Sequence, residues 1–128
     1  MKLLLDTHVY LWSRTEPSRL SAKERAAIRD RGNELFLSVA SAWEIEIKRS
    51  IGKLDAPDDW MERTEDFGVQ WLPVRAEHVR ALRLLPPTHR DPFDRILVAQ
   101  SRAENLRLLT HDPLVLRYFV GSAAESSR

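Results

Sequence analysis

Two patterns of apolar residues alternate along the chain: short consecutive runs and stretches with helical spacing. Short runs of consecutive apolar residues are typical of strands buried on both faces of a parallel sheet, and such runs occur at 2–5, 34–38, 69–74 and 106–110. Between the runs, apolar residues recur at helical spacing. Because strands alternate with helices, we predict an α/β fold with a central, mainly parallel sheet of four to five strands, flanked by helices in three layers.

Capping signals set the predicted helix boundaries. Ser21 and Glu24 form a capping-box pattern at the start of a helix over 22–31. Asp91 followed by Pro92 predicts an N-cap with proline at the first helical position. Pro73 weakens the third strand and places it near an edge of the sheet. Further helices are predicted to begin near Val9, Val39, Asp58 and Arg75, and a last short helix or strand is predicted over 114–120.

Length and composition indicate one ordinary globular domain. The 128 residues are 43% hydrophobic and 30% charged, with a net charge of +1, so total charge does not indicate non-specific binding to nucleic acid. The absence of cysteine excludes disulfides, thiolate nucleophiles and cysteine-ligated metals. No apolar run has the length of a signal-peptide core or a membrane span, so we expect a cytoplasmic protein without membrane association. The predicted domain covers 1–120, and a polar tail over 121–128 is expected to be mobile.

Four acidic residues stand at corresponding places in the predicted elements. Asp6 directly follows the first strand, and Glu44 lies in the early turns of the helix after the second. Asp94 is in the first turn of its helix, and Asp112 comes just after the last strand. In a parallel sheet, all these positions lie at the edge where the carboxyl ends of the strands meet. We therefore expect the four carboxylates to form one site.

Each acid also has a structural interpretation. Asp6 could cap the helix that follows it, and Glu44 could close a capping box with Ser41. Asp94 is favoured in a first turn by the helix dipole, by roughly 0.3–1 kcal/mol. Asp91 is interpreted as a cap, although a role as a ligand stays open. One shared functional site explains why all four acids lie at the same edge of the sheet more simply than four independent structural roles do.

A hard divalent cation would explain such a site. At about 5 Å and an effective dielectric near 20, each pair of ionised carboxylates costs roughly 3 kcal/mol. Carboxylates and water are the ligands of Mg²⁺ or Mn²⁺, and either ion offsets this repulsion. Such an ion activates water and stabilises charge on a phosphoryl group, which suits phosphodiester hydrolysis. Arg90 and Arg95 are candidates to bind a phosphate.

The histidines have weaker interpretations. His8, His89 and His111 flank three of the acids. Because metal-activated water needs no histidine base, we expect contacts to the substrate or to the ligands instead. His78 is expected to be a half-exposed surface residue.

Four strings in this sequence resemble the PIN-domain endoribonucleases, and among them the VapC-like toxins of bacterial toxin–antitoxin pairs. The strings are LLLDTHVYLW, SVASAWEIEIK, HRDPFDRILVAQ and LLTHD. They occur in the order and spacing of the family, and the resemblance extends over nearly the whole chain. The middle two are specific. The resemblance implies a PIN-like fold, and it places the family's four acidic positions, which bind metal and catalyse, on Asp6, Glu44, Asp94 and Asp112.

The resemblance also implies an activity and partners. It implies a Mg²⁺- or Mn²⁺-dependent ribonuclease that cleaves RNA, forms a homodimer, and is silenced by a cognate VapB-like antitoxin whose C-terminal segment occupies the site. The residues expected to contact the substrate or support the ligands are Thr7, Ser41, Arg90, Asp91, Arg95 and His111.

Other α/β proteins with an acid after the first strand fit less well. A haloacid-dehalogenase-type phosphatase needs a second aspartate two residues after Asp6, where this chain has His8. A response-regulator receiver needs a lysine after a late strand, and the last lysine of this chain is Lys53. The alternative that stays open is a catalytically silent PIN fold that binds RNA or protein.

Overall fold

A computed structural model describes residues 1–87 and 91–119. In this part of the chain four strands form one sheet in the order β3-β2-β1-β4, and every neighbouring pair is parallel. The strands are β1 (Lys2–Leu5), β2 (Glu34–Ser38), β3 (Val69–Leu72) and β4 (Arg107–Leu109). The predicted parallel α/β fold is confirmed.

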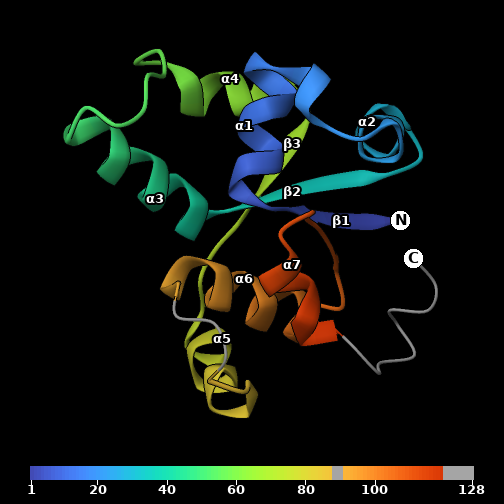
Figure 1. Cartoon of the computed structure of the whole chain (residues 1–128), viewed down its shortest axis with the longest axis vertical. Coiled ribbons are helices and arrows are strands. Elements are labelled where there is room, and N and C mark those ends of the chain that lie inside the picture. The colour runs from blue at the N-terminus through green and yellow to red at the C-terminus, as the bar shows by residue number, and fades with distance from the viewer. Residues whose placement is uncertain (88–90, 120–128) are drawn as a thin grey trace.

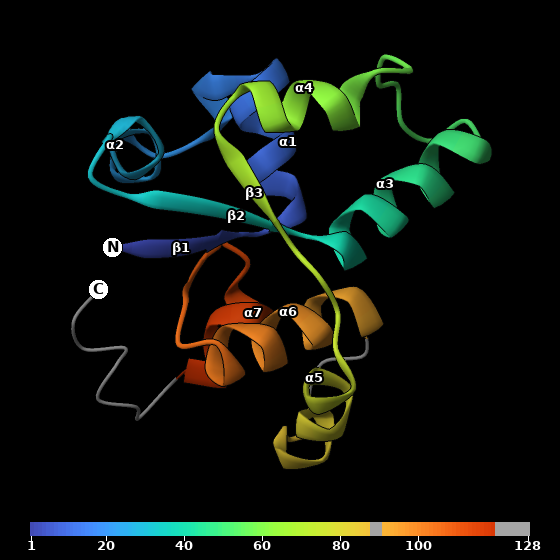
Figure 2. The same cartoon turned by 180° about the vertical axis from the view of Figure 1, so that it is seen from behind.

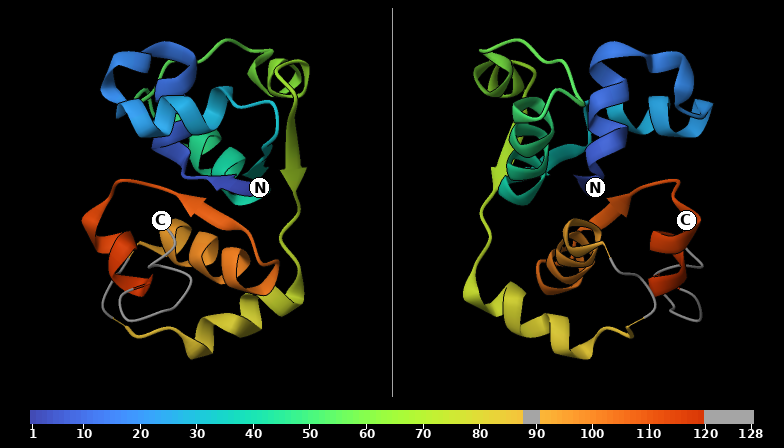
Figure 3. Two further views of the ribbon diagram at one scale, coloured as in Figure 1. Left: turned by 90° about the vertical axis from the view of Figure 1, so that its right-hand side faces the viewer. Right: turned by 60° about the vertical axis from the view of Figure 1, so that its left-hand side comes forward.

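Helices cover both faces of the sheet. Figure 1 shows α1, α2 and α4 on one side of β1 and β2, with α5, α6 and α7 on the other, and the views in Figures 2 and 3 agree. The α-helices of the described residues are α1 (Thr7–Thr15), α2 (Ala22–Arg29), α3 (Val39–Ser50), α4 (Trp60–Asp66), α5 (Ala76–Ala81), α6 (Pro92–Ala103) and α7 (Pro113–Leu116). Short 3-10 turns occupy Pro17–Arg19, Leu82–Leu84 and Arg117–Phe119.

The central strand β1 contributes to two apolar cores. Successive residues of a strand point to opposite faces, so Leu4 packs into the core beneath α6 and α7, whereas Leu5 packs into the core beneath α1 and α3. Both leucines are essentially inaccessible to solvent. Because β1 is buried on both faces, its carboxyl end is held firmly, and Asp6 follows it directly.

The element boundaries differ from the predictions at several points. Strand β3 ends at Leu72, before Pro73, and it is the predicted edge strand. The residues after Asp112 form α7 and a 3-10 turn through Phe119, so the strand alternative is wrong for the described part of that segment. Residues 88–90, which include His89 and Arg90, and the tail over 121–128 lie outside the described residues. None of the described helices combines the length and apolar character needed to cross a bilayer.

Candidate active site

Asp6 connects β1 to α1 and is buried. Its side chain is held from two sides: Oδ1 accepts a hydrogen bond from the His8 backbone N–H at 2.8 Å, and Oδ2 accepts one from the Thr110 hydroxyl at 2.7 Å. The first bond caps α1, so the capping interpretation of Asp6 is confirmed. The second joins Asp6 to the end of β4, which no capping role requires.

Thr110 joins two of the four acids. Its hydroxyl donates to Asp6 and accepts a hydrogen bond from the backbone N–H of Asp112 at 3.1 Å. The Asp112 carboxylate in turn caps α7 by accepting from the Leu114 N–H at 2.9 Å. The sequence analysis missed Thr110, although a threonine at the end of a buried strand and two residues before an acid was a usable signal.

A cavity of about 200 Å³ lies at this edge of the sheet. Asp6 and Asp112 both line it, so these two predicted residues share one space. The remaining lining residues are His8, Val9, Trp12, Thr110 and His111.

Glu44 is buried in α3 and has a cationic partner. Its Oε2 accepts from the Lys48 ammonium at 3.0 Å, one helical turn away. The capping-box interpretation with Ser41 is wrong, because α3 begins at Val39 with the side chain of Ser38 as its cap. Ser41 is a fully buried residue inside the helix.

Thr7 joins the neighbourhoods of Asp6 and Glu44. Its hydroxyl donates to the Ser41 hydroxyl at 2.8 Å, and both side chains are buried. Because Thr7 follows Asp6 and Ser41 lies one turn before Glu44, this bond fixes the start of α1 against α3. The bond thus connects the segments that carry Asp6 and Glu44, and the role of Thr7 and Ser41 in supporting these acids stays a prediction.

Asp94 lies in the first turn of α6, as predicted. The cap of this helix is Asp91, whose Oδ1 accepts from the backbone N–H groups of Phe93 and Asp94 at 2.9 and 3.3 Å, so the predicted cap is confirmed. Phe93 makes an edge-to-face contact with Trp43 at 5.3 Å between ring centroids. The residues preceding Asp94 and Glu44 are therefore in contact, which brings α6 and α3 together.

Arg95 is engaged within the fold. Its guanidinium donates to the backbone carbonyl of Pro86 at 2.8 Å and to the hydroxyl of Tyr118 at 3.1 Å. These bonds tie α6 to the loop before it and to the turn after α7. Arg95 thus has a structural role that the sequence analysis did not predict, and its phosphate contact stays a prediction.

In the described part of the chain, no three of the four proposed carboxylates offer oxygens that all lie within 4.8 Å of one another. Among residues 1–87 and 91–119, the one group of three acidic or histidine side chains whose ligand atoms lie within 4.8 Å of each other is Glu77, His78 and Glu104. Glu104 follows the far end of α6, about 15 Å from Asp94 along the helix axis at 1.5 Å per residue. That group is therefore separate from the predicted site.

His78 has no solvent exposure, and both of its ring nitrogens have hydrogen-bond partners, with Gln100 as a further, longer contact of Nδ1 at 3.4 Å. Its Nδ1 accepts from the Arg75 N–H at 2.9 Å, and its Nε2 lies 2.7 Å from a carboxylate oxygen of Glu104. The prediction of a half-exposed surface histidine is wrong, because α5 packs this side chain against α6. Since both ring nitrogens are used, we interpret the group as a structural connection between the two helices.

The predicted site fits a hard cation by its donor chemistry. Its four side chains offer carboxylate oxygens, the ligands that Mg²⁺ and Mn²⁺ prefer. Both Asp6 oxygens accept one hydrogen bond each, and a carboxylate oxygen has two lone pairs, so each keeps one for a ligand bond. Because Mg²⁺ usually keeps several waters and is held directly by one or two carboxylates, it need not contact all four side chains.

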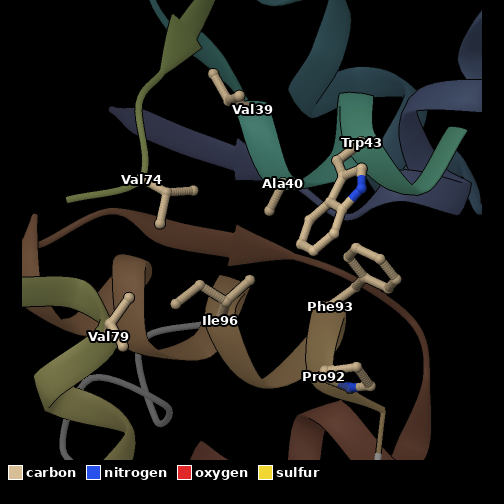
Figure 4. A pocket seen from close by; sticks show the side chains of 8 residues that line it. All are labelled: Val39, Ala40, Trp43, Val74, Val79, Pro92, Phe93 and Ile96. Atoms are coloured by element: carbon tan, nitrogen blue, oxygen red, sulfur yellow. The ribbon is translucent and has the colours of Figure 1, made fainter. Parts of the chain in front are cut away.

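An apolar groove of about 450 Å³ lies beside the acids, between α3, α6 and the segment after β3. Figure 4 shows Trp43 of α3 next to Phe93 of α6, with the side chains of Val74 and Val79 further along. Trp43 is 64% exposed, an unusual fraction for so large an apolar side chain. The lining residues are Val39, Ala40, Trp43, Val74, Val79, Pro92, Phe93 and Ile96, and none carries a charge.

Comparisons with known proteins match this architecture. The PIN domain family matches residues 3–118. Ribonuclease VapC22 of Mycobacterium tuberculosis is 29% identical over 126 residues, covering 86% of each chain.

Two solved structures share the fold. One is the crystal structure of VapBC2 from Rickettsia felis bound to a DNA fragment from its promoter. A chain of that structure superposes with a TM-score of 0.69 at 14% identity, and the match covers 92% of this chain and 93% of that one. A chain of a toxin–antitoxin complex from Klebsiella pneumoniae gives 0.60 at 13% identity, covering 94% and 92%.

Proposed function

Because this chain belongs to the PIN domain family, we propose that it is a metal-dependent endoribonuclease and the toxin of a type II toxin–antitoxin pair. The observation that carries the proposal is the Thr110 hydroxyl, which links Asp6 and Asp112 across one cavity. The similarity to a named VapC ribonuclease over most of both chains supports the same reaction. A ribonuclease acts where RNA is present, so the proposed location is the cytoplasm.

Nucleases of the PIN family generally use divalent metal, and we propose Mg²⁺, replaceable by Mn²⁺, for this chain. The ligands would be Asp6, Glu44, Asp94 and Asp112. When bound, the ion supplies an activated water and neutralises charge that develops on the phosphoryl group.

The chain itself positions the acids. Thr110 and the His8 N–H orient the Asp6 carboxylate, and Thr7 with Ser41 holds α1 against α3. The Lys48 ammonium balances the charge of Glu44. No side-chain nucleophile is required in this scheme, because the attacking group is water.

The test is cleavage of a labelled single-stranded RNA of mixed sequence in Mn²⁺. We expect Asp6→Asn and Asp94→Asn each to reduce the rate by at least about 100-fold, because each removes a metal ligand. Asp59→Asn is the matched control, since this exposed acid pairs with Arg63 on α4 and should retain full activity. Circular dichroism would verify that the variants are folded.

Two outcomes would contradict the proposal. Full activity in both Asp6→Asn and Asp94→Asn would exclude the metal-nuclease site. RNA binding without cleavage by the wild-type protein, in either metal, would favour the catalytically silent alternative.

We propose a cognate VapB-like antitoxin as the protein partner. The two solved structures that share the fold are those of a VapBC pair bound to DNA and of a toxin–antitoxin complex, which motivates this assignment. The antitoxin's C-terminal segment would occupy the acidic cavity. A short reading frame beside the gene, whose product co-purifies with this chain and inhibits RNA cleavage, would support it, and a product that leaves cleavage unchanged would contradict it.

We propose a second copy of the chain as the occupant of the apolar groove. The groove is uncharged, whereas RNA is bound mainly through cationic contacts to its phosphates. Apolar, self-complementary patches are the usual basis of two-fold homodimers. This arrangement would place the interface next to Glu44 and Asp94.

A further inference from the structure

His111 is fixed within the cavity by two neighbours. Its Nδ1 lies 3.0 Å from Oε2 of Glu24, and its ring stacks on Trp12 with centroids 4.8 Å apart and planes 14° from parallel. Glu24 is buried and comes from α2, and Trp12 comes from α1. Two helices far from β4 in sequence therefore hold a side chain that lines the same cavity as Asp6.

The contact with Glu24 determines which nitrogen carries the proton. A carboxylate only accepts hydrogen bonds, so in the neutral imidazole the hydrogen is on Nδ1 and Nε2 is an acceptor. Within residues 1–87 and 91–119, Nε2 of His111 has no hydrogen-bond partner. His111, which lines the cavity together with Asp6 and Asp112, thus offers a hydrogen-bond acceptor that no group in this part of the chain uses.

The chemistry of an RNA strand offers this acceptor one donor near the reacting bond. Phosphate oxygens and the ring oxygen of ribose accept hydrogen bonds, but the 2′-hydroxyl can donate, and DNA lacks it. The 2′-hydroxyl is adjacent to the 3′-oxygen of the same nucleotide, so a group beside the acids can reach it while the phosphate lies at the metal ligands.

We infer that Nε2 of His111 accepts a hydrogen bond from the ribose 2′-hydroxyl at the scissile phosphate, and that this contact makes the site favour RNA over DNA. Glu24 is the positioning residue, because it acts only through His111. The inference rests on the proposed ribonuclease function and identifies the part of the substrate that His111 binds.

Glu24 also has a structural role that a substitution can preserve. Its Oε1 accepts from the Ser21 backbone N–H at 2.8 Å in the capping box of α2. In Glu24→Gln the amide oxygen retains this bond, since glutamine also forms capping boxes. The amide NH₂ then faces Nδ1 of His111 and donates to it, which moves the ring hydrogen to Nε2 and converts the acceptor into a donor.

The experiment compares two versions of one substrate. The cut position in a mixed-sequence RNA is first mapped in Mn²⁺, and a second oligonucleotide then carries a single 2′-deoxyribose there. We expect wild-type kcat/KM to favour the all-ribose version by about tenfold, the value of one such hydrogen bond. Glu24→Gln and His111→Ala should lower the all-ribose rate to that of the 2′-deoxy version, whose rate should change little.

Glu104→Gln is the matched control. Glu104 pairs with His78 in the same carboxylate–imidazole manner, but at the far end of α6. This variant should retain the tenfold preference. Equal rates on the two substrates in wild type, or an unchanged preference in Glu24→Gln, would overturn the inference while leaving the ribonuclease assignment intact.

Nitrogen-15 NMR of the histidine side chains gives a readout independent of cleavage. We expect the Nδ1–H form of His111 in wild type and the Nε2–H form in Glu24→Gln. Adding the mixed-sequence RNA should shift the Nε2 resonance, and DNA of the same sequence should not. If RNA is not cut at all, the proposed function fails, and the absence of this RNA-specific shift would separately refute the role of His111.

Discussion

The hydroxyl of Thr110 makes hydrogen bonds to two of the proposed metal-binding residues, Asp6 and Asp112. Thr110→Val retains the shape and β-branching of the side chain but removes one hydrogen bond to the buried Asp6 carboxylate and one from the Asp112 N–H. A hydrogen bond to a charged group contributes about 1.5–3 kcal/mol and a neutral one about 0.5–1.5 kcal/mol. The added methyl group recovers up to about 0.8 kcal/mol of apolar burial.

The balance predicts that Thr110→Val lowers the free energy of unfolding by about 1–4 kcal/mol. Because the hydroxyl also orients Asp6, Mn²⁺ affinity should fall roughly 10- to 100-fold, as it does when a group that holds a metal ligand is removed. Urea unfolding followed by circular dichroism measures the first quantity, and titration calorimetry with Mn²⁺ measures the second.

Two further variants control for substitution at a threonine. Thr110→Ser retains the hydroxyl and should bind Mn²⁺ as the wild type does. Thr15→Val removes an exposed hydroxyl that bonds only to the Leu11 carbonyl, and should change stability by about 0.5 kcal/mol or less. If Thr110→Val matched the wild type in both stability and Mn²⁺ affinity, the bridge would have no role in the site.

Two other predictions concern the apolar groove and the loss of stability at acid pH. Trp43→Glu should convert the proposed dimer into a monomer, as measured by light scattering, whereas Phe67→Glu, at an exposed site outside the groove, should not. A wild-type protein that is itself a monomer would contradict the proposed interface. The hydrogen bond from the Trp60 indole, aided by Arg49, lowers the pKa of Glu46. The stability that ionised Glu46 contributes is therefore complete above the ordinary glutamate pKa of about 4.3, and it is lost as pH falls through the lower pKa of the folded state. Urea unfolding between about pH 5 and pH 3 should show a shallower loss of stability in Glu46→Gln, and an unchanged slope would exclude this role.

Local patterns predicted the elements and their caps well. The alternation of apolar runs with helical periods predicted the parallel sheet, and the capping signals at Ser21 and Asp91 were both confirmed. The edge to which the four acids belong follows from this order alone, because a parallel sheet places the carboxyl ends of all its strands together.

Contacts between distant parts of the chain were not predictable. Thr110 and Asp6 are 104 residues apart, and no periodicity encodes their hydrogen bond. The burial of His78 depends on how the short helix α5 packs on α6, which its few apolar residues do not indicate. The capping-box pattern formed by Ser41 and Glu44 was misleading, because Ser38 at the end of β2 is the residue that caps α3.

The ion pair between Glu44 and Lys48 has a consequence for folding. The ammonium group already balances one buried acid, and donors from the chain already satisfy Asp6. We therefore expect the chain to fold without a divalent ion, unlike small domains that stay unfolded until metal binds. The proposed ion would then be needed for RNA cleavage and not for folding.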